Sequence, residues 1–306
     1  MALLLVLLGA CNGCGPQLPN PTEDPRVDTS PPPDDSGPDT ETAETGPPPR
    51  CDREETEPNS PPDGTEELDL ELWACGEFLT YIDYDSFRVT PTQPGWLKIQ
   101  VDAASRGSPA NPQLIVSGGG ESAELLDGYL TTDPLLVFPV DTLEPYTLTL
   151  GETNFLYGED YSWFMLASLS KEPVEWDAEE AEPNNGFASA APFTLGHTVL
   201  GAVSSASDLD WYKLTTASEG EQTLTFTVNA FKEGSAANLV LVLYASDGAT
   251  VLREETTGPI AYDRDPYFTT KITGVQDLYL LARTEDGRGS RFHWYTLTIE
   301  SSAAAE

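Results

Sequence analysis

Along the second half of the chain, apolar and polar residues alternate with a period of two, and turn residues interrupt the alternation at regular intervals. The breaks contain turn formers, as in Ser246-Asp247-Gly248 and Glu285-Asp286-Gly287. Strands are predicted at residues 198–203, 211–215, 223–230, 239–244, 250–254, 268–272, 278–283 and 294–299. The preceding half predicts strands at residues 96–101, 113–117, 135–140, 146–150 and 162–168. No segment has a convincing helical period, so the chain is predicted to be all-β.

Polar motifs recur along this β-rich region. Glu55-Thr56-Glu57-Pro58-Asn59 returns as Glu180-Ala181-Glu182-Pro183-Asn184, and Asp83-Tyr84-Asp85 returns as Asp208-Leu209-Asp210, both 125 positions later. Later landmarks drift, and Gly158 and Trp163 are paired with Gly289 and Trp294 at an offset of 131. Two motifs at one spacing indicate a tandem duplication. With seven or eight short strands per copy, we predict two jelly-roll-like β-sandwich domains, at residues 51–170 and 171–306.

The second copy resembles the bacterial pre-peptidase C-terminal domain over residues 178–300. The resemblance rests on Glu-Pro-Asn, then Gly201, then Asp-x-Asp-Trp-Tyr, then Gly220 before a Leu-x-Phe-x-Val strand, and a closing Tyr295-x-Leu297-x-Ile299. The first copy is similar but more degraded, because Ser86-Phe87 stands in place of Trp-Tyr. The resemblance implies a jelly-roll sandwich that serves as an accessory module on secreted or surface proteins.

Oxygen-bearing side chains in the recurring motifs suggest a calcium site, since Ca²⁺ takes six to eight hard oxygen ligands. The resemblance to collagenase-type members of the family implies six ligand positions in the second copy: Glu180, Glu182, Asn184, Asn185, Asp208 and Asp210. The first copy is the weaker candidate, with Glu55, Glu57, Asn59, Asp83 and Asp85. In the alternative reading there is no metal, and Asn184 and Asp210 cap backbone N–H groups of the turn and the neighbouring strand.

The N-terminus reads as a targeting segment. Residues 1–10 are apolar and uncharged, about half the length of a membrane-spanning helix, and Leu8-Gly9-Ala10-Cys11 resembles the bacterial lipobox. The resemblance implies a lipoprotein signal peptide over residues 1–10 and a lipidated Cys11 as the mature N-terminus. Residues 15–50 hold eleven Pro and eight Asp or Glu, which predicts that residues 11–50 form a disordered, extended stalk.

The cysteines fit an exported protein. Cys51 and Cys75 flank one segment at the start of the first domain and are predicted to form a disulfide. Cys14 has no obvious partner, and a Cys-x-x-Cys redox site formed with Cys11 is the alternative. Because Asn12 rather than Asp follows Cys11, we expect export to the outer membrane or cell surface of a bacterium.

Charge narrows the range of partners. The chain carries 51 Asp and Glu against 15 Lys and Arg, a net charge of −36, so it is repelled by nucleic acid and by anionic lipid headgroups. Cations or cationic surfaces are the better partners, and the lipid anchor is the expected contact with the membrane. Enzymatic motifs are missing from the sequence, and His197 and His293 are read as surface or strand-edge residues.

Tryptophans offer a second kind of site. Trp211 and Trp294 lie in predicted strands and are read as core residues, with stacking on a ligand as the alternative. Trp176, in the connector between the copies, is either a wedge between the domains or an exposed anchor. We expect a non-enzymatic, lipid-anchored surface protein that binds an extracellular polymer or protein. A structural spacer and a hydrolase with a carboxylate pair are the alternatives.

Overall fold

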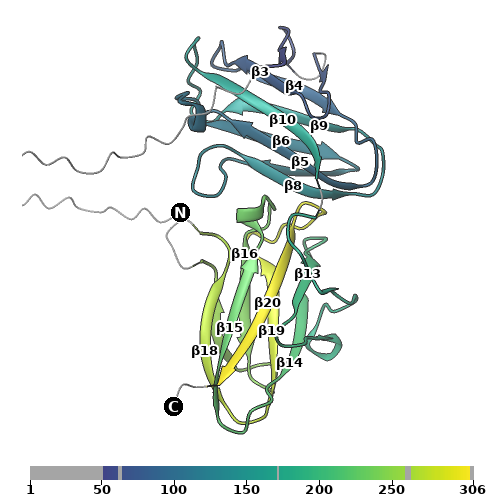
Figure 1. The fold of residues 1–306 in the computed structure, drawn as a ribbon, viewed down its shortest axis with the longest axis vertical. Helices are drawn as coiled ribbons and strands as arrows, with labels where there is room; N and C mark the ends of the chain where they lie inside the picture. Colours follow the sequence, from purple (N-terminus) through teal and green to yellow (C-terminus); the bar gives the residue numbers. More distant parts are fainter. Residues whose placement is uncertain (1–50, 61–63, 171, 259–262, 304–306) are drawn as a thin grey trace, which may run out of the picture. The chain divides into compact units, whose positions relative to one another are not determined.

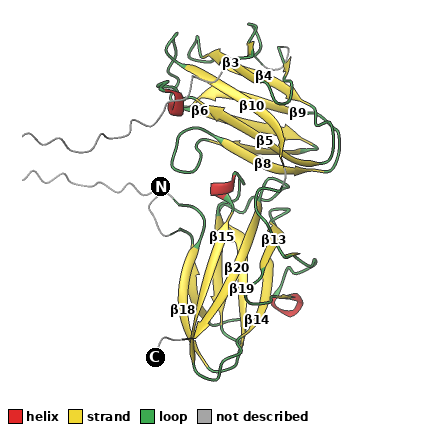
Figure 2. Cartoon of the chain, in the orientation of Figure 1, coloured by secondary structure: helices red, strands yellow, loops and turns green. Residues whose placement is uncertain are grey.

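The computed structural model describes residues 51–60, 64–170, 172–258 and 263–303. Residues 47–306 make up one compact unit. The predicted signal peptide, Cys11, Cys14 and the stalk lie outside the described residues. Within the described ranges there are strands and three short 3-10 turns but no α-helix (Figure 2), as the period-two pattern predicts. None of the described residues belongs to a helix long and apolar enough to cross a membrane.

The first sandwich consists of two five-stranded sheets (Figure 1). One sheet has the order β1-β3-β10-β5-β8, formed by Arg53–Glu54, Trp73–Glu77, Ser162–Ser170, Gly95–Asp102 and Leu135–Val140. The other has the order β2-β4-β9-β6-β7, formed by Glu66–Glu67, Tyr84–Val89, Tyr146–Glu152, Pro112–Gly118 and Glu121–Leu125. A 3-10 turn, η1 (Ala104–Arg106), follows β5.

The second sandwich repeats this plan. One sheet has the order β11-β13-β20-β15-β18, formed by Ala178–Glu179, Thr198–Ala202, Trp294–Ala303, Glu221–Asn229 and Tyr267–Thr273. The other has the order β12-β14-β19-β16-β17, formed by Ala191–Pro192, Asp210–Thr215, Asp277–Thr284, Leu239–Tyr244 and Val251–Glu255. The 3-10 turns are η2 (Phe187–Ser189) and η3 (Phe231–Glu233).

Strand order identifies both sandwiches as jelly rolls. If the eight main strands of each copy are lettered B to I in chain order, the two sheets read B-I-D-G and C-H-E-F in both copies. Each sandwich adds two short strands at its sheet edges, and these pair in parallel with the first two main strands. The prediction of two tandem jelly-roll sandwiches is therefore confirmed.

The pairing register corrects the alignment of the two copies at their C-terminal ends. Trp163 lies opposite Gly76, whereas the residue opposite Gly201 is Tyr295 rather than Trp294. Gly76 and Gly201 are 125 positions apart, so the closing strands β10 and β20 correspond at an offset of 132. The same offset relates Leu150 in β9 to Ala282 in β19, because these residues lie opposite Asp85 and Asp210. The predicted offset of 131 is therefore wrong, because it paired Trp163 with Trp294, which occupy different positions in their sandwiches.

In both sandwiches, every second side chain along the strands points into the core. In β15 the residues at even positions from Gln222 to Val228 are buried and those between them are partly exposed, while β10 alternates in the same way from Trp163 to Ala167. Each sandwich has a cluster of buried apolar side chains, and the cluster of the first also includes Phe292 from the second. Burial of these side chains stabilises each sandwich by roughly 25 cal/mol per Å² of apolar surface removed from water.

A third apolar cluster joins residues of the two sandwiches. Trp294 is 1% exposed and packs edge-on against Trp96, with ring centroids 5.0 Å apart. Its indole N–H donates a hydrogen bond to the carbonyl oxygen of Val137, 2.7 Å away. Trp176 in the connector contacts Trp96, with centroids 6.1 Å apart, which fits the prediction of a wedge. Trp211, predicted to be a core residue, is instead half-buried on the outer face of its sheet beside Tyr244.

Cys51 and Cys75 form a disulfide that ties the first described residue to β3. The two cysteines are 24 positions apart. A cross-link of that span lowers the conformational entropy of the unfolded chain, which stabilises the folded state by about 3 kcal/mol. Reduction, or replacement of both cysteines by serine, is expected to lower the free energy of unfolding by that amount in urea titrations. Equal urea midpoints for oxidised and reduced protein would contradict this prediction.

Candidate metal centres in the two sandwiches

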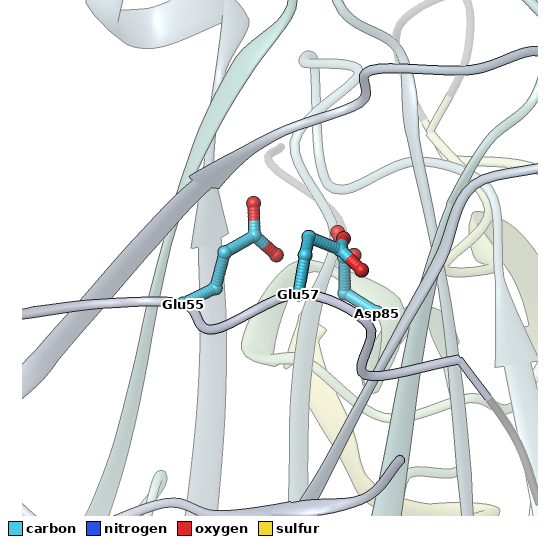
Figure 3. A group of neighbouring side chains, drawn as sticks. All are labelled: Glu55, Glu57 and Asp85. Carbon is cyan, nitrogen blue, oxygen red and sulfur yellow. The ribbon is translucent and has the colours of Figure 1, made fainter. Parts of the chain in front are cut away.

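Three carboxylates meet at one site in each sandwich. In the second sandwich they belong to Glu180, Glu182 and Asp210, with one oxygen of each lying within 4.8 Å of the others. In the first sandwich Glu55, Glu57 and Asp85 form the matching group. Figure 3 shows these three side chains converging, Glu55 and Glu57 from one extended segment and Asp85 from β4. Every member of both groups is among the residues singled out by the sequence motifs.

The same backbone contacts build both sites. In the second sandwich, Glu180 accepts a hydrogen bond from the backbone N–H of Ala202, and Glu182 accepts one from the backbone N–H of Asn184. In the first, Glu55 accepts from Glu77 and Glu57 accepts from Asn59. Both acceptor pairs and both donor pairs are 125 positions apart. The duplication therefore preserved the three-dimensional arrangement as well as the sequence motif.

A glycine beside each site allows the strands and side chains to approach closely. A Cβ built on Gly201 would lie 2.5 Å from the ring of Tyr295 and 2.9 Å from the hydroxyl of Tyr212. A Cβ on Gly76 would lie 2.0 Å from the carboxylate of Glu55 and 2.5 Å from the indole of Trp163. Contacts under 3.0 Å force neighbouring atoms to move. This explains on steric grounds why glycine stands in both copies.

The aspartate and asparagine of each site are completely buried, but some of their oxygens have no partner. Asp85, Asp210, Asn59 and Asn184 are each 0% exposed. Among the described residues, no N–H or hydroxyl group donates to either carboxylate oxygen of Asp85, which faces the carboxyl group of Glu55, and Oδ1 of Asp210, Asn59 and Asn184 has no hydrogen-bond partner. Buried polar atoms are nearly always paired, because leaving one unpaired costs about 1–3 kcal/mol or more. These oxygens are therefore available to a cation.

Other buried acids in the same chain do find donors. Asp265 is 3% exposed and its carboxylate accepts hydrogen bonds from the backbone N–H groups of Phe231 and Lys232, which begin η3. Asp133, 6% exposed, accepts three bonds from residues 103–105 before and within η1. Burial alone thus does not leave a carboxylate unpaired in this fold, and among the described residues the buried carboxylate oxygens without an N–H or hydroxyl donor belong to the two sites.

Three ionised carboxylates at one buried site are electrostatically unfavourable. Burial, together with the neighbouring carboxylates, raises the pKa of Asp85 to about 10 and that of Asp210 to about 9. Burial also raises the pKa of Glu180 to about 7 and shifts the pKa of Glu55 upward. Two unit charges 4.8 Å apart repel each other by about 3 kcal/mol at an effective dielectric constant of 20. A divalent cation would offset this repulsion and return the pKa values to the acid range.

The two sites differ in their tyrosines. In the second sandwich the hydroxyl of Tyr295 donates to Oδ2 of Asp210 (2.6 Å), and the hydroxyl of Tyr212 lies 3.0 Å from Oε2 of Glu180 and 2.7 Å from the Tyr295 hydroxyl. The first sandwich has Phe87 and Trp163 at these positions. The buried indole N–H of Trp163 finds no acceptor among the described residues. Sequence reasoning did not assign the tyrosines to the site, although the family motif contains both.

The structure changes the ranking of the two copies as candidate metal sites. The sequence made the first copy the weaker metal candidate because its motif is degraded. The structure nevertheless gives it the same three carboxylates, and no N–H or hydroxyl group donates to either oxygen of Asp85, whereas one oxygen of Asp210 accepts from Tyr295. Glu55 and Glu57 also line a cavity of about 450 Å³ together with Trp163.

Three predicted ligands lie outside the clusters and bind backbone groups instead. Asp208 accepts hydrogen bonds from the backbone N–H and the hydroxyl of Ser204, at 2.7 and 2.6 Å. Asp83 holds the corresponding turn of the first sandwich through the N–H groups of Leu79 and Thr80. Asn185 is exposed, and its Oδ1 accepts from the N–H of Leu209. These three capping residues are not among the converging carboxylates, and the predicted capping of backbone N–H groups by the side chains of Asn184 and Asp210 is not found among the described residues.

Neither histidine joins an acid or a nucleophile in a catalytic arrangement among the described residues. His197 is exposed. His293 is buried, at 6% exposed, and directly precedes β20, as in the strand-edge form of the prediction, and its Nδ1 lies 2.9 Å from the hydroxyl of Ser290. Burial lowers its pKa below the ordinary value of a histidine. Its environment is that of a structural histidine next to the last strand.

Comparison with known proteins adds little beyond the fold. No protein-family model matches the chain, and no curated protein sequence matches it. The pre-peptidase C-terminal domain of a collagenase from Bacillus anthracis is 15% identical, with a TM-score of 0.29, over 42% of this chain and 98% of that domain. The tandem CBM51 modules of a family 98 glycoside hydrolase from Streptococcus pneumoniae are 12% identical, with a TM-score of 0.25, over 72% of this chain and 81% of theirs. These values support no inference about ligands, so the class of the molecule, a tandem jelly-roll protein, rests on its strand order.

Proposed function

We propose that this chain is a non-enzymatic, calcium-stabilised binding protein, lipid-anchored to the outer membrane or surface of a bacterial cell. The observation that carries the proposal is the pair of preserved carboxylate sites, each with completely buried oxygens that lack a donor. Six to eight oxygen ligands are what calcium requires, and carboxylates, the asparagine amide oxygen and water can supply them. Glu180, Glu182, Asn184 and Asp210 would hold the ion in the second sandwich, and Glu55, Glu57, Asn59 and Asp85 in the first.

Burial argues for a structural rather than a catalytic role of these carboxylates. A hydrolase needs both members of its carboxylate pair in contact with the substrate. Asp85 and Asp210 are 0% exposed, so a substrate cannot reach them. A bound ion would instead fix the segment that enters each sandwich against β4 or β14, leaving the faces and loops of the modules to bind partners.

The anchor and the stalk complete the proposal. Acylation of Cys11 would hold the protein at a membrane, because each buried methylene contributes about 0.8 kcal/mol. The stalk of residues 11–50 would then carry the modules away from the lipid surface. The excess negative charge keeps such an exposed protein soluble and favours cationic partners.

Two measurements test the proposal. Intact mass of the protein from its native membrane should show an acylated Cys11 as the first residue, and an unmodified Cys11 thiol would contradict the anchor. Immobilised residues 47–306 should bind at least one member of a panel of glycans, fibrous proteins and cell-wall polymers in 1 mM CaCl₂. No binding across the panel would favour the spacer alternative, whereas hydrolysis of a panel member would favour the hydrolase.

A further inference from the structure

Two neighbouring loops of the first sandwich expose an unusual number of large apolar side chains. Of the fifteen large apolar side chains exposed in the described residues, six lie in these loops. They are Leu79, Tyr81 and Ile82 between β3 and β4, and Phe155, Leu156 and Tyr157 between β9 and β10, with exposed fractions of 46–61%. We call this group the apolar loop pair. Soluble proteins seldom gather exposed apolar side chains in this way unless they mark an interaction site.

Backbone contacts hold the two loops side by side. The N–H of Gly158 donates to the carbonyl of Phe78 (2.8 Å), and the N–H of Phe78 donates to the carbonyl of Tyr161 (3.1 Å). Asp83 accepts hydrogen bonds from the first loop, and Glu152, 8% exposed, accepts one from the N–H of Leu156 in the second. Ordered loops lose little conformational entropy when a partner binds.

The second sandwich shows that the fold does not require these apolar side chains. At the offset of 125, Leu79, Tyr81 and Ile82 correspond to Ser204, Ala206 and Ser207. At the offset of 132, Phe155, Leu156 and Tyr157 correspond to Gly287, Arg288 and Gly289. Phe155 and Gly287 have matching positive φ angles of 58° and 67°, so the backbone is shared while the side chains differ. The apolar side chains of these two loops were therefore acquired or retained in the first sandwich only.

Charge around the loops indicates the kind of partner. The loops themselves, residues 78–83 and 153–161, hold three acidic residues and no Lys or Arg. Asp83 lies in the first loop, and Glu159 and Asp160 lie in the second. An anionic lipid surface would be repelled by this rim. Half of the six side chains are aliphatic and have no ring that could stack on a sugar. This composition favours packing against protein side chains over stacking on sugar rings.

We propose that the apolar loop pair docks a protein segment in which apolar side chains alternate with Lys or Arg. The apolar side chains of the segment would pack on Tyr81, Ile82 and Phe155, and its cations would face the acidic rim. This proposal deepens the proposed binding function by naming a surface and a partner class, and it rests on that function.

The test uses residues 47–306 in 1 mM CaCl₂ and a fluorescent peptide of equal Leu and Lys content, with Leu/Glu and Ser/Lys peptides as composition controls. The variant Tyr81→Ala/Ile82→Ser/Phe155→Gly places the residues of the second copy in the first and leaves the net charge unchanged. We expect the Leu/Lys peptide to bind the unmodified protein in preference to both control peptides, and the variant to bind it at least tenfold more weakly.

A matched control removes apolar side chains elsewhere. Leu143→Ser/Val275→Ser replaces residues that are 53% and 54% exposed, one at the opposite end of β9 from Phe155 and one in the second sandwich. Its affinity should stay within twofold of the unmodified protein. The reciprocal variant Ala206→Tyr/Ser207→Ile should increase the amount of peptide bound, which keeps the test informative if the loop variant unfolds.

Several results would overturn the proposal. One is equal affinity of the unmodified protein and the folded loop variant. Another is loop-dependent binding to neutral glycans or zwitterionic vesicles without binding to the Leu/Lys peptide. Both would leave the proposed binding function intact, whereas absence of binding to every probe would count against that function as well.

Discussion

At pH 8, 1 mM Ca²⁺ is expected to raise the free energy of unfolding of cation-free protein by about 2.7 kcal/mol for each site that it fills, if free calcium exceeds the dissociation constant of that site 100-fold. The physical reason is that the buried carboxyl groups of each cation-free site either repel one another or must take up protons, a cost that a divalent cation removes and the unfolded chain does not bear. Thermal unfolding of residues 47–306, recorded with EDTA or with CaCl₂, measures this increase. Magnesium is the control ion, because it prefers a smaller octahedral shell with retained waters and should have a weaker effect.

The calcium effect should depend on pH in a defined direction. In the cation-free protein the pKa values of about 9 for Asp210 and about 10 for Asp85 lie far above the unfolded value of about 3.9. Groups with a raised pKa favour the folded state fully below their unfolded pKa, and this contribution is lost as pH rises toward the folded pKa. Stability in EDTA should therefore fall from pH 5 to pH 9. Because calcium binds the ionised carboxylates, the curves with and without calcium should diverge as pH rises.

Paired substitutions separate cluster residues from capping residues. Asp85→Asn/Asp210→Asn should stabilise the cation-free protein at pH 8, because each buried Asp must take up a proton on folding whereas Asn is neutral in both states, and should abolish most of the response to calcium. Asp83→Ala/Asp208→Ala should instead lower stability by about 1 kcal/mol per lost cap and keep the response. An unchanged melting temperature of the unmodified protein in calcium, or a full response of the Asn variant, would show that the clusters do not hold the ion.

Period-two alternation was sufficient to predict the strands that are buried on one face. All eight main strands of the second copy were predicted to within a few residues, since most alternate buried with more exposed side chains and β16 is a continuous apolar run. In the first copy β3, β4 and β7 escaped prediction. In β4, Asp85 and Ser86 are both buried, so polar residues occupy core-facing positions and the alternation of hydrophobicity is lost. The buried polar residues of the site thus removed the pattern by which β4 could have been predicted.

Spacing identified the carboxylates of the site but not their separate roles. Asp208 and Asp210 are two positions apart and chemically identical, yet one closes a turn and the other is buried beside Glu180. Their roles depend on where β14 begins, at Asp210, which a sequence pattern locates only approximately. The pairing of Trp163 with Trp294 failed for a related reason, because residue identity was used where the register of β10 and β20 decides.

Replacing Trp294 by alanine is expected to lower the free energy of unfolding by about 3–5 kcal/mol, the usual cost of removing a large aromatic side chain from a packed site. The indole is 1% exposed and contacts Trp96, and its N–H bond to Val137 links residues of the two copies. Urea denaturation followed by circular dichroism measures the loss. Trp294→Phe keeps much of the apolar contact and loses the hydrogen bond, so its cost should fall between zero and that of alanine.

Trp211 supplies the matched control, because it is a strand tryptophan of the same sandwich that is only half-buried. Trp211→Ala should cost clearly less than Trp294→Ala. If the Trp96–Trp294 contact couples the sandwiches, Trp294→Ala should also split a single unfolding transition into two, while Trp211→Ala should not. Equal costs for the two alanine variants would mean that the cluster of Trp96, Val137 and Trp294 contributes no more than an ordinary surface contact, and that the modules are stabilised independently by their own cores.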